Sequence, residues 1–484
     1  MPILTDQEFI IDIGPQGTFR NSGNYHTDPS DINAVFAKFE TEGTKKIALY
    51  FHGGLVSETS GLNGARDIRP HIEAAGCYPV CFVWETGLLE TIGTNLAKIS
   101  ETKLFNKLLK LLLKKVTEKL GYDTLLGRGV AGGGLTDAQI NLELSKPVPF
   151  ADFTKTAPPE NSRSAVNTEA LAARRFMLET ELSRELAGTI SVDPEFQALI
   201  QDTRLTVADD AGGGSRGIIS SLNFISHVVK VAYRIITRFL DHRDHDLYPT
   251  IVEEILREFY VAELGAWVWK MMKDKSDGMW TDNTGCSGPD QYAGRYFLDK
   301  LAAYKTAHPE VTIDLIGHSA GSIAICNLFK HTAAHAQSFA YNHVIFMAPA
   351  VRIDLFKTEM LAFPGRYKDI RIFTMSDYYE CRDIMVPFFY THSLLYLISG
   401  ALEDEGVSYD AYILGLERHI GYAVPYAIPD LQGTHNYLYK AALNRMSFSV
   451  FGGTDQGLET RAQKHGDFHE DAATLRSMTF ILSK

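Results

Sequence analysis

The chain has few cysteines and lacks a long uninterrupted apolar run. Five cysteines are scattered over 484 residues, which predicts reduced core thiols and neither a disulfide framework nor a zinc site. The N-terminus has no basic segment followed by an apolar one, so the sequence predicts no secretory signal and a cytoplasmic location. The most apolar helical segment, residues 218–240, is interrupted by lysine, arginine and histidine, which argues against a transmembrane span.

An excess of positive charge is also missing. The formal net charge is −12, which argues against the basic surface that a nucleic-acid-binding protein needs. Glycine triplets stand at 132–134 and 212–214, but they lack the lysine and the preceding strand of a phosphate-binding loop. We therefore expect no cofactor. The triplets are either hinges or surface loop.

The segment Asp241–Asp246 (DHRDHD) contains residue types that bind metals. Its charges alternate around Arg243, and its spacing fits no tetrahedral site. The sequence therefore predicts a charged linker here and no metal.

Short apolar runs, bounded by turn residues, fall into two separated blocks. Such runs are typical of strands that are buried on both faces of a parallel sheet. We expect the strands at residues 46–51, 78–84, 311–316, 343–347, 370–375 and 446–451, with an edge strand at 7–13. Helical segments alternate with the strands, at 291–308 and 322–335 among others. This alternation predicts an α/β protein with a doubly wound, mostly parallel sheet.

The stretch between the two blocks differs in composition from both. It begins with a helix rich in leucine and lysine and ends in two long amphipathic helices. Structureless loops of this length are uncommon, so we expect an inserted helical cap or lid. The predicted organisation is an N-terminal core part at 1–87, the insertion at 88–289 and a C-terminal core part at 290–484.

A G-x-S-x-G motif follows the predicted strand at 311–316 and precedes a helix rich in small residues. It reads Gly317-His318-Ser319-Ala320-Gly321. A serine at such a tight turn adopts a strained backbone, and side chains two residues before and after it would collide. Because a helix starts at the turn, its free N–H groups favour negative charge on an attacked carbonyl oxygen. We predict that Ser319 is a nucleophile.

A glycine turn that follows the strand at 46–51 is a candidate for the oxyanion hole. It reads His52-Gly53-Gly54-Leu55. Glycines allow the backbone to approach a substrate closely. We expect the N–H of Gly54 or Leu55 to point at the oxyanion, together with the N–H of Ala320.

A serine nucleophile needs a general base that is oriented by a carboxylate. Asp377 directly follows the predicted strand at 370–375 and is the first candidate for the acid. Asp383 is the second candidate and Asp354 the third, and each could equally be an ordinary turn residue.

The base is expected between the last strand and the last helix, where two histidines stand. We favour His465, which precedes a glycine at a loop tip, over His469, which lies near the start of the predicted helix at 470–482. Weaker candidates precede the last strand: His392, His419 and His435.

Together these motifs resemble the α/β-hydrolases, most closely their lipase and esterase branches. The resemblance covers roughly residues 40–90 and 290–484. It implies hydrolysis of an ester, thioester or amide through an acyl-enzyme, with Ser319, Asp377 and His465 as the triad. The large insertion departs from the small members of the family.

The insertion carries the only hint of a substrate. Lys103–Leu120 is basic and amphipathic, and residues 218–240 repeat this pattern. Such helices bind membrane interfaces, but they also pack on protein cores. The leading hypothesis is a serine hydrolase that cleaves a lipophilic carboxylic ester, with peripheral membrane contact through Lys103–Leu120. The alternatives are an acyltransferase, a peptidase or a thioesterase with the same triad, or a catalytically silent hydrolase-like binding protein.

Overall fold

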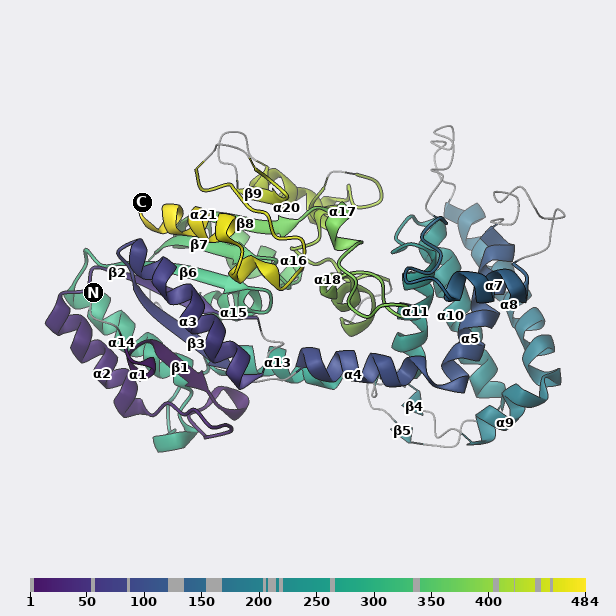
Figure 1. The fold of residues 1–484 in the computed structure, drawn as a ribbon, viewed down its shortest axis with the longest axis horizontal. Helices are drawn as coiled ribbons and strands as arrows, with labels where there is room; N and C mark the ends of the chain where they lie inside the picture. Colours follow the sequence, from purple (N-terminus) through teal and green to yellow (C-terminus); the bar gives the residue numbers. More distant parts are fainter. Residues whose placement is uncertain are drawn as a thin grey trace.

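In a computed structural model of the chain, seven strands form one sheet in the order β1-β3-β2-β6-β7-β8-β9 (Figure 1). Every pairing in this sheet is parallel. The strands are β1 (Ile10–Ile13), β2 (Lys46–Phe51), β3 (Tyr78–Trp84), β6 (Thr312–His318), β7 (Tyr341–Met347), β8 (Tyr367–Met375) and β9 (Met446–Ser449). The predicted α/β class with a parallel sheet is confirmed.

The structure describes residues 4–484 with the exception of thirteen internal segments. These are 54–56, 85–87, 121–134, 154–167, 203–205, 208–214, 217–220, 262–265, 334–339, 404–408, 422, 440–444 and 453–455. Both glycine triplets lie outside the described residues.

The predicted strands at 46–51 and 78–84 coincide with β2 and β3. At the N-terminus the expected strand is shorter than predicted, because Asp6–Phe9 forms the short helix α1. Thr5 and Glu8 form a capping box that starts this helix. The edge position of β1 is as expected.

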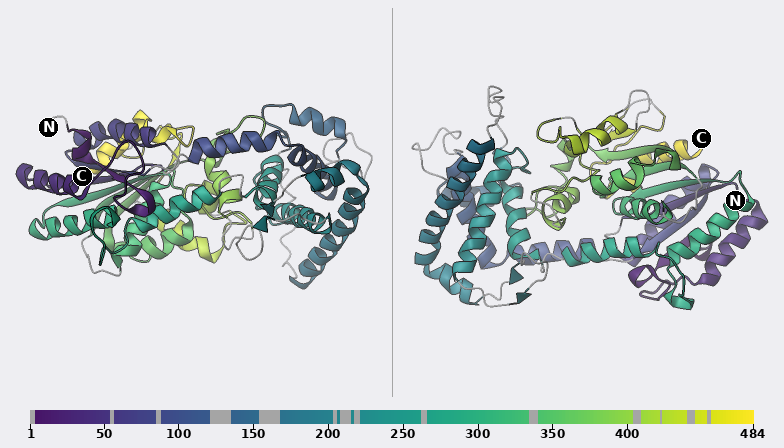
Figure 2. Two further views of the ribbon diagram at one scale, coloured as in Figure 1. Left: turned by 90° about the horizontal axis from the view of Figure 1, so that it is seen from below. Right: turned by 180° about the vertical axis from the view of Figure 1, so that it is seen from behind.

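Helices cover both faces of the sheet (Figures 1 and 2). On one face lie α3 (Glu58–Ala74) and α21 (Ala472–Leu482), and on the other lie α14 (Ala293–Ala307) and α15 (Gly321–Ala333). Helix α15 is buried almost throughout, as its small and apolar residues require. Further helices of this part are α2 (Pro29–Glu42), α16 (Ile353–Phe356), α17 (Asp377–Glu380), α18 (Leu394–Leu397), α19 (Glu417–Ile420) and α20 (Pro429–Leu438).

Between β3 and β6 the chain forms a helical body beside the sheet (Figure 1). Its helices are α5 (Lys103–Leu120), α7 (Asp137–Leu144), α8 (Thr168–Val192), α9 (Pro194–Asp202), α10 (Ser221–Leu240) and α11 (Leu247–Phe259), with a small hairpin of β4 (Thr206–Val207) and β5 (Ser215–Arg216). Two helices connect this body to the sheet, α4 (Leu88–Ser100) and α13 (Ala266–Gly278).

The basic helix α5 packs inside this body. Its apolar stripe is buried, including Leu108 and Leu112 at 0% exposure. Lysines on its polar side pair with acidic residues of neighbouring elements: Lys107 with Asp193 at 2.9 Å, and Lys119 with Glu181 and Glu185 at 2.8 and 2.9 Å. These contacts are those of a helix that packs on protein. Among the described residues, no helix is long and apolar enough to cross a membrane.

A buried charge network fixes α10 against α11. Arg238 binds Glu253 at 2.9 Å and Glu254 at 3.0 Å, and all three side chains are fully buried. Burial raises the pKa of Glu253, but His245 and Arg238 outweigh burial and bring this pKa to about 2. Tyr390, from the C-terminal part of the chain, donates a hydrogen bond to Glu253 at 2.7 Å. The same network therefore ties the helical body to the rest of the molecule.

Replacing Arg238 by methionine should destabilise the protein by about 3–5 kcal/mol, because it leaves two carboxylates buried without their shared partner. Urea unfolding would measure the loss. Arg476→Met is the matched control: Arg476 binds Glu459 but is 62% exposed, so the loss should stay below about 1 kcal/mol. Equal losses in the two variants would contradict a structural role of the network.

Candidate active site

Ser319 lies at the turn between β6 and α15, with a positive φ of 50°. This conformation is strained for a residue with a Cβ. Hydrogen bonds hold the turn in place: the Ser319 N–H donates to the Met347 carbonyl at 2.8 Å, and the Ser319 carbonyl accepts from the Ser322 hydroxyl at 2.6 Å and from the Ala350 N–H at 3.1 Å.

The two motif glycines are required by close contacts on both sides of Ser319. A Cβ at Gly317 would lie 2.8 Å from the carbonyl carbon of Gly321. At Gly321 a Cβ would lie 2.1 Å from the carbonyl oxygen of Phe51. Neither position can hold a side chain unless the backbone moves. The collision expected from the sequence is therefore present.

His465 lies against the serine hydroxyl. Its Nε2 is 2.8 Å from Ser319 Oγ, and both residues are buried. This distance is within the reach of a general base. Of the two histidines proposed from the sequence, the one favoured there is in hydrogen-bond contact with Ser319. His469 packs instead on the ring of His318, with a centroid distance of 5.2 Å.

Among the described residues, Asp377 makes no hydrogen bond or ion pair with His465, so its predicted role as the acid has no support in this geometry. The Asp377 carboxylate is bound by Arg418 at 3.1 Å and by the Tyr396 hydroxyl at 2.5 Å. Asp383 lies beside the base instead, and its Oδ2 accepts a hydrogen bond from the backbone N–H of His465 at 2.8 Å. Asp354, the third candidate, pairs with Arg352 at 2.6 Å.

The sequence could not show whether Asp377 or Asp383 lies beside His465. Asp377 is the first acidic residue after β8, but it is also the first residue of α17. Asp383 comes after this helix. Arg418, a distant residue in sequence, binds Asp377 and leaves Asp383 as the carboxylate at His465. The Nδ1 atom of His465 is buried and makes no hydrogen bond within the described part of the chain. A triad acid would accept its proton from this atom, and such contacts often tighten only with substrate bound.

The glycine turn after β2 meets the nucleophile. A Cβ at Gly53 would lie 3.3 Å from the Cβ of Ser319. Gly54 and Leu55, the predicted oxyanion donors of this turn, lie outside the described residues. Ala320, the third predicted donor, directly precedes α15 and is buried beside Ser319.

His52 anchors this glycine turn, a role that sequence reasoning missed. Its Nε2 accepts a hydrogen bond from the Trp84 N–H at 3.0 Å, so its Nδ1 carries the proton that is donated to the Gly53 carbonyl at 2.6 Å. Its ring also stacks on Trp84 with a centroid distance of 4.7 Å. Burial lowers the pKa of His52 to about 4, so the ring is neutral and the tautomer is fixed.

His318, inside the motif, also contributes unexpectedly. Its Nε2 lies 3.1 Å from the His465 carbonyl, and its ring stacks on that of His465. Burial, with the nearby His469 and His465, lowers the pKa of His318 well below its ordinary value. A neutral His318 therefore holds the backbone of the base in place.

A cavity of about 350 Å³ opens over these residues. Its polar wall includes Ser319, His465 and Asp383. Its apolar lining includes Ile384, Met385 and Leu394. Such a combination of an apolar wall and a few convergent polar groups is typical of a small-molecule site.

No protein-family model matches the chain, and no curated protein or solved structure matches it either. The site is therefore interpreted from its own geometry.

The pH profile of turnover should reveal the depressed basicity of His465. Burial, reinforced by His469, lowers the pKa of His465 from 6.5 to about 4. A general base must be neutral, so kcat/KM should stay high as pH falls through 6.5 and drop only near pH 4. Measuring kcat/KM for a soluble nitrophenyl ester across this range would test the prediction.

Replacing His469 by glutamine should shift this acidic limb upward, because the repulsion that opposes protonation of His465 is removed. His435→Gln is the control, since His435 Nδ1 contacts the Ile420 carbonyl and not this site. An acidic limb at 6.5 in the wild type would contradict a desolvated base.

Proposed function

We propose that this protein is a serine hydrolase of the α/β-hydrolase class. The observation that carries the proposal is the 2.8 Å contact between His465 Nε2 and the hydroxyl of Ser319, a serine held at positive φ between a strand and a helix. A binding protein has no need for a strained serine that contacts a neutral, buried histidine. The parallel sheet and the chain order serine, acid, histidine support the same class.

More particularly, we propose that the enzyme cleaves a carboxylic ester of a lipophilic substrate. The apolar lining of the cavity by Ile384, Met385 and Leu394, next to Ser319, supports an apolar acyl or alcohol group. The cavity is also lined by two charged side chains close to His465 in the sequence, Lys464 and Asp467.

In the proposed reaction, Ser319 Oγ attacks the ester carbonyl while His465 Nε2 takes the hydroxyl proton. The oxyanion that forms is stabilised by the N–H of Ala320 at the start of α15 and by the glycine turn after His52. His465 then gives the proton to the leaving alcohol, and an acyl-Ser319 remains. Water, activated by His465, attacks this acyl group, and the acid is released with Ser319 regenerated.

Asp383 is the acid of this proposal. It is half-buried beside His465, and this partial burial is the main cause that raises its pKa. A carboxylate at this place stabilises the imidazolium that forms during attack. Asp377 is assigned instead to the ion pair with Arg418.

Ser319→Ala should lower kcat by about 10⁶-fold, the order expected when a triad serine is removed. It should leave the melting temperature unchanged or slightly higher, because the change removes only a hydroxyl from a strained turn. An active-site-directed fluorophosphonate should label the wild type and not this variant. Equal labelling of both proteins would refute Ser319 as the nucleophile.

Asp383→Asn and Asp377→Asn form a matched pair that tests the acid. The first change should lower kcat by about 10⁴-fold with little loss of stability, because it removes the charge that faces His465. The second should leave kcat near the wild-type value and lower the melting temperature, because Arg418 is 14% exposed and loses its carboxylate partner. The reverse ranking of the two kcat values would return the acid role to Asp377.

A further inference from the structure

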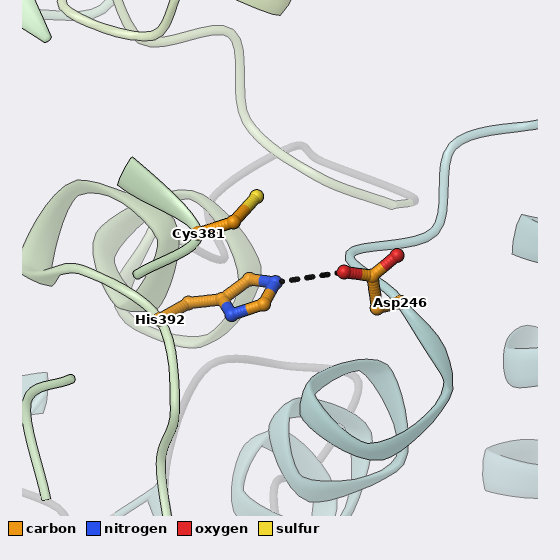
Figure 3. A group of neighbouring side chains, drawn as sticks. All are labelled: Asp246, Cys381 and His392. Atoms are coloured by element: carbon orange, nitrogen blue, oxygen red, sulfur yellow. Dashed lines mark ion pairs between the residues drawn. The ribbon is translucent and has the colours of Figure 1, made fainter. Parts of the chain in front are cut away.

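Three side chains with metal-binding groups converge where the helical body meets the sheet-bearing part (Figure 3). Asp246 directly precedes α11, Cys381 ends α17, and His392 lies shortly before α18. The nearest carboxylate oxygen, thiol sulfur and ring nitrogen all lie within 4.8 Å of one another. Asp246 is far in sequence from Cys381 and His392, so only the tertiary fold brings it to them.

The imidazole ring of His392 is buried, and its two nitrogen atoms lack hydrogen-bond partners among the described residues. Its side chain is 5% exposed, and neither ring nitrogen is hydrogen-bonded within the described part of the chain. The Asp246 carboxylate lies 3.4 Å from Nε2, which is long for a charge-assisted hydrogen bond. Buried polar atoms are normally satisfied, so an unsatisfied ring that faces a thiol and a carboxylate indicates a missing ligand.

The chemical types of the three side chains indicate which metal ion would bind. Magnesium and calcium take oxygen ligands, whereas thiolate and imidazole together favour zinc and its chemical relatives. Three protein ligands leave a fourth tetrahedral position. A cavity of about 270 Å³, lined by Asp246, Cys381 and His392, offers space for a water at this position.

We propose that Asp246, Cys381 and His392 bind a zinc ion, with a water from the cavity as the fourth ligand. The ion joins the start of α11 to the segment that carries Asp383, two residues beyond Cys381. Ile384 lines both this cavity and the one over Ser319, so the metal site borders the active site without sharing its polar residues. Without the ion, the Cys381 thiol donates a hydrogen bond to the Tyr396 hydroxyl at 3.6 Å.

The competing state is a proton in place of the metal. Zinc has to displace this proton, so binding should weaken as pH falls.

The full chain, stripped with a chelator and dialysed, is titrated with Co²⁺ and with Zn²⁺. We expect one equivalent of Co²⁺ to bind with a thiolate-to-cobalt charge-transfer absorption, and Zn²⁺ to displace it and raise the melting temperature. Cys381→Ser should abolish the absorption, and His392→Ala and Asp246→Asn should weaken binding by at least about 100-fold. Cys286→Ser is the matched control, because Cys286 is a partly exposed free thiol that lies outside this cluster; it should keep the absorption.

X-ray absorption at the zinc edge identifies the atoms bound to the ion in the wild-type protein, so this test does not depend on the variants. The wild type should show one sulfur and three nitrogen or oxygen neighbours at the ion. No binding at one equivalent, a charge-transfer absorption that survives Cys381→Ser, or a zinc spectrum without sulfur would overturn the proposal. Fluorophosphonate labelling of Ser319 is scored separately, so failure of the metal site is distinct from failure of the proposed hydrolase.

Discussion

The approach of the Phe51 carbonyl to Gly321 is the contact on which the site depends. β2 ends at Phe51, and α15 begins at Gly321, where there is no room for a side chain. The same approach places Gly53 against the Cβ of Ser319. The glycine turn, the strained serine and the free N–H groups at the start of the helix therefore meet within one small volume. In the reaction that we propose, a substrate carbonyl in that volume meets the Ser319 hydroxyl and the backbone N–H of Ala320.

Burial determines the electrostatics of this volume. Three histidines, His52, His318 and His465, have pKa values below the ordinary range, chiefly because a positive charge is costly to bury. As neutral rings, His52 and His318 form hydrogen bonds with backbone groups. Two of them position backbone, and the third contacts Ser319. In the proposed mechanism, the same desolvation keeps His465 neutral and able to take a proton.

The junction between the helical body and the sheet is polar, in contrast to the apolar core. Arg238, Glu253 and Tyr390 form one buried network there, and the Asp246–Cys381–His392 cluster lies at the same junction. Buried charges of this kind give strong directional contacts but little net stability over an apolar interface. These contacts fix the position of the segment from Cys381 to His392. The same segment carries Asp383 and part of the cavity wall.

The sequence by itself determined the parallel α/β sheet, since runs such as residues 46–51 and 78–84 are apolar on both faces and can be buried only in such a sheet. It also determined that Ser319 lies at a tight turn between a strand and a helix, because the glycines two residues before and after it are required by that turn. Only the tertiary structure decided that Asp383 lies at His465, because Arg418, remote in the sequence, binds Asp377. It likewise decided that the apolar stripe of α5 is buried while Lys107 and Lys119 form ion pairs, and that Asp246 meets Cys381 and His392. Local patterns determine local backbone, whereas contacts between distant segments depend on how the whole chain packs.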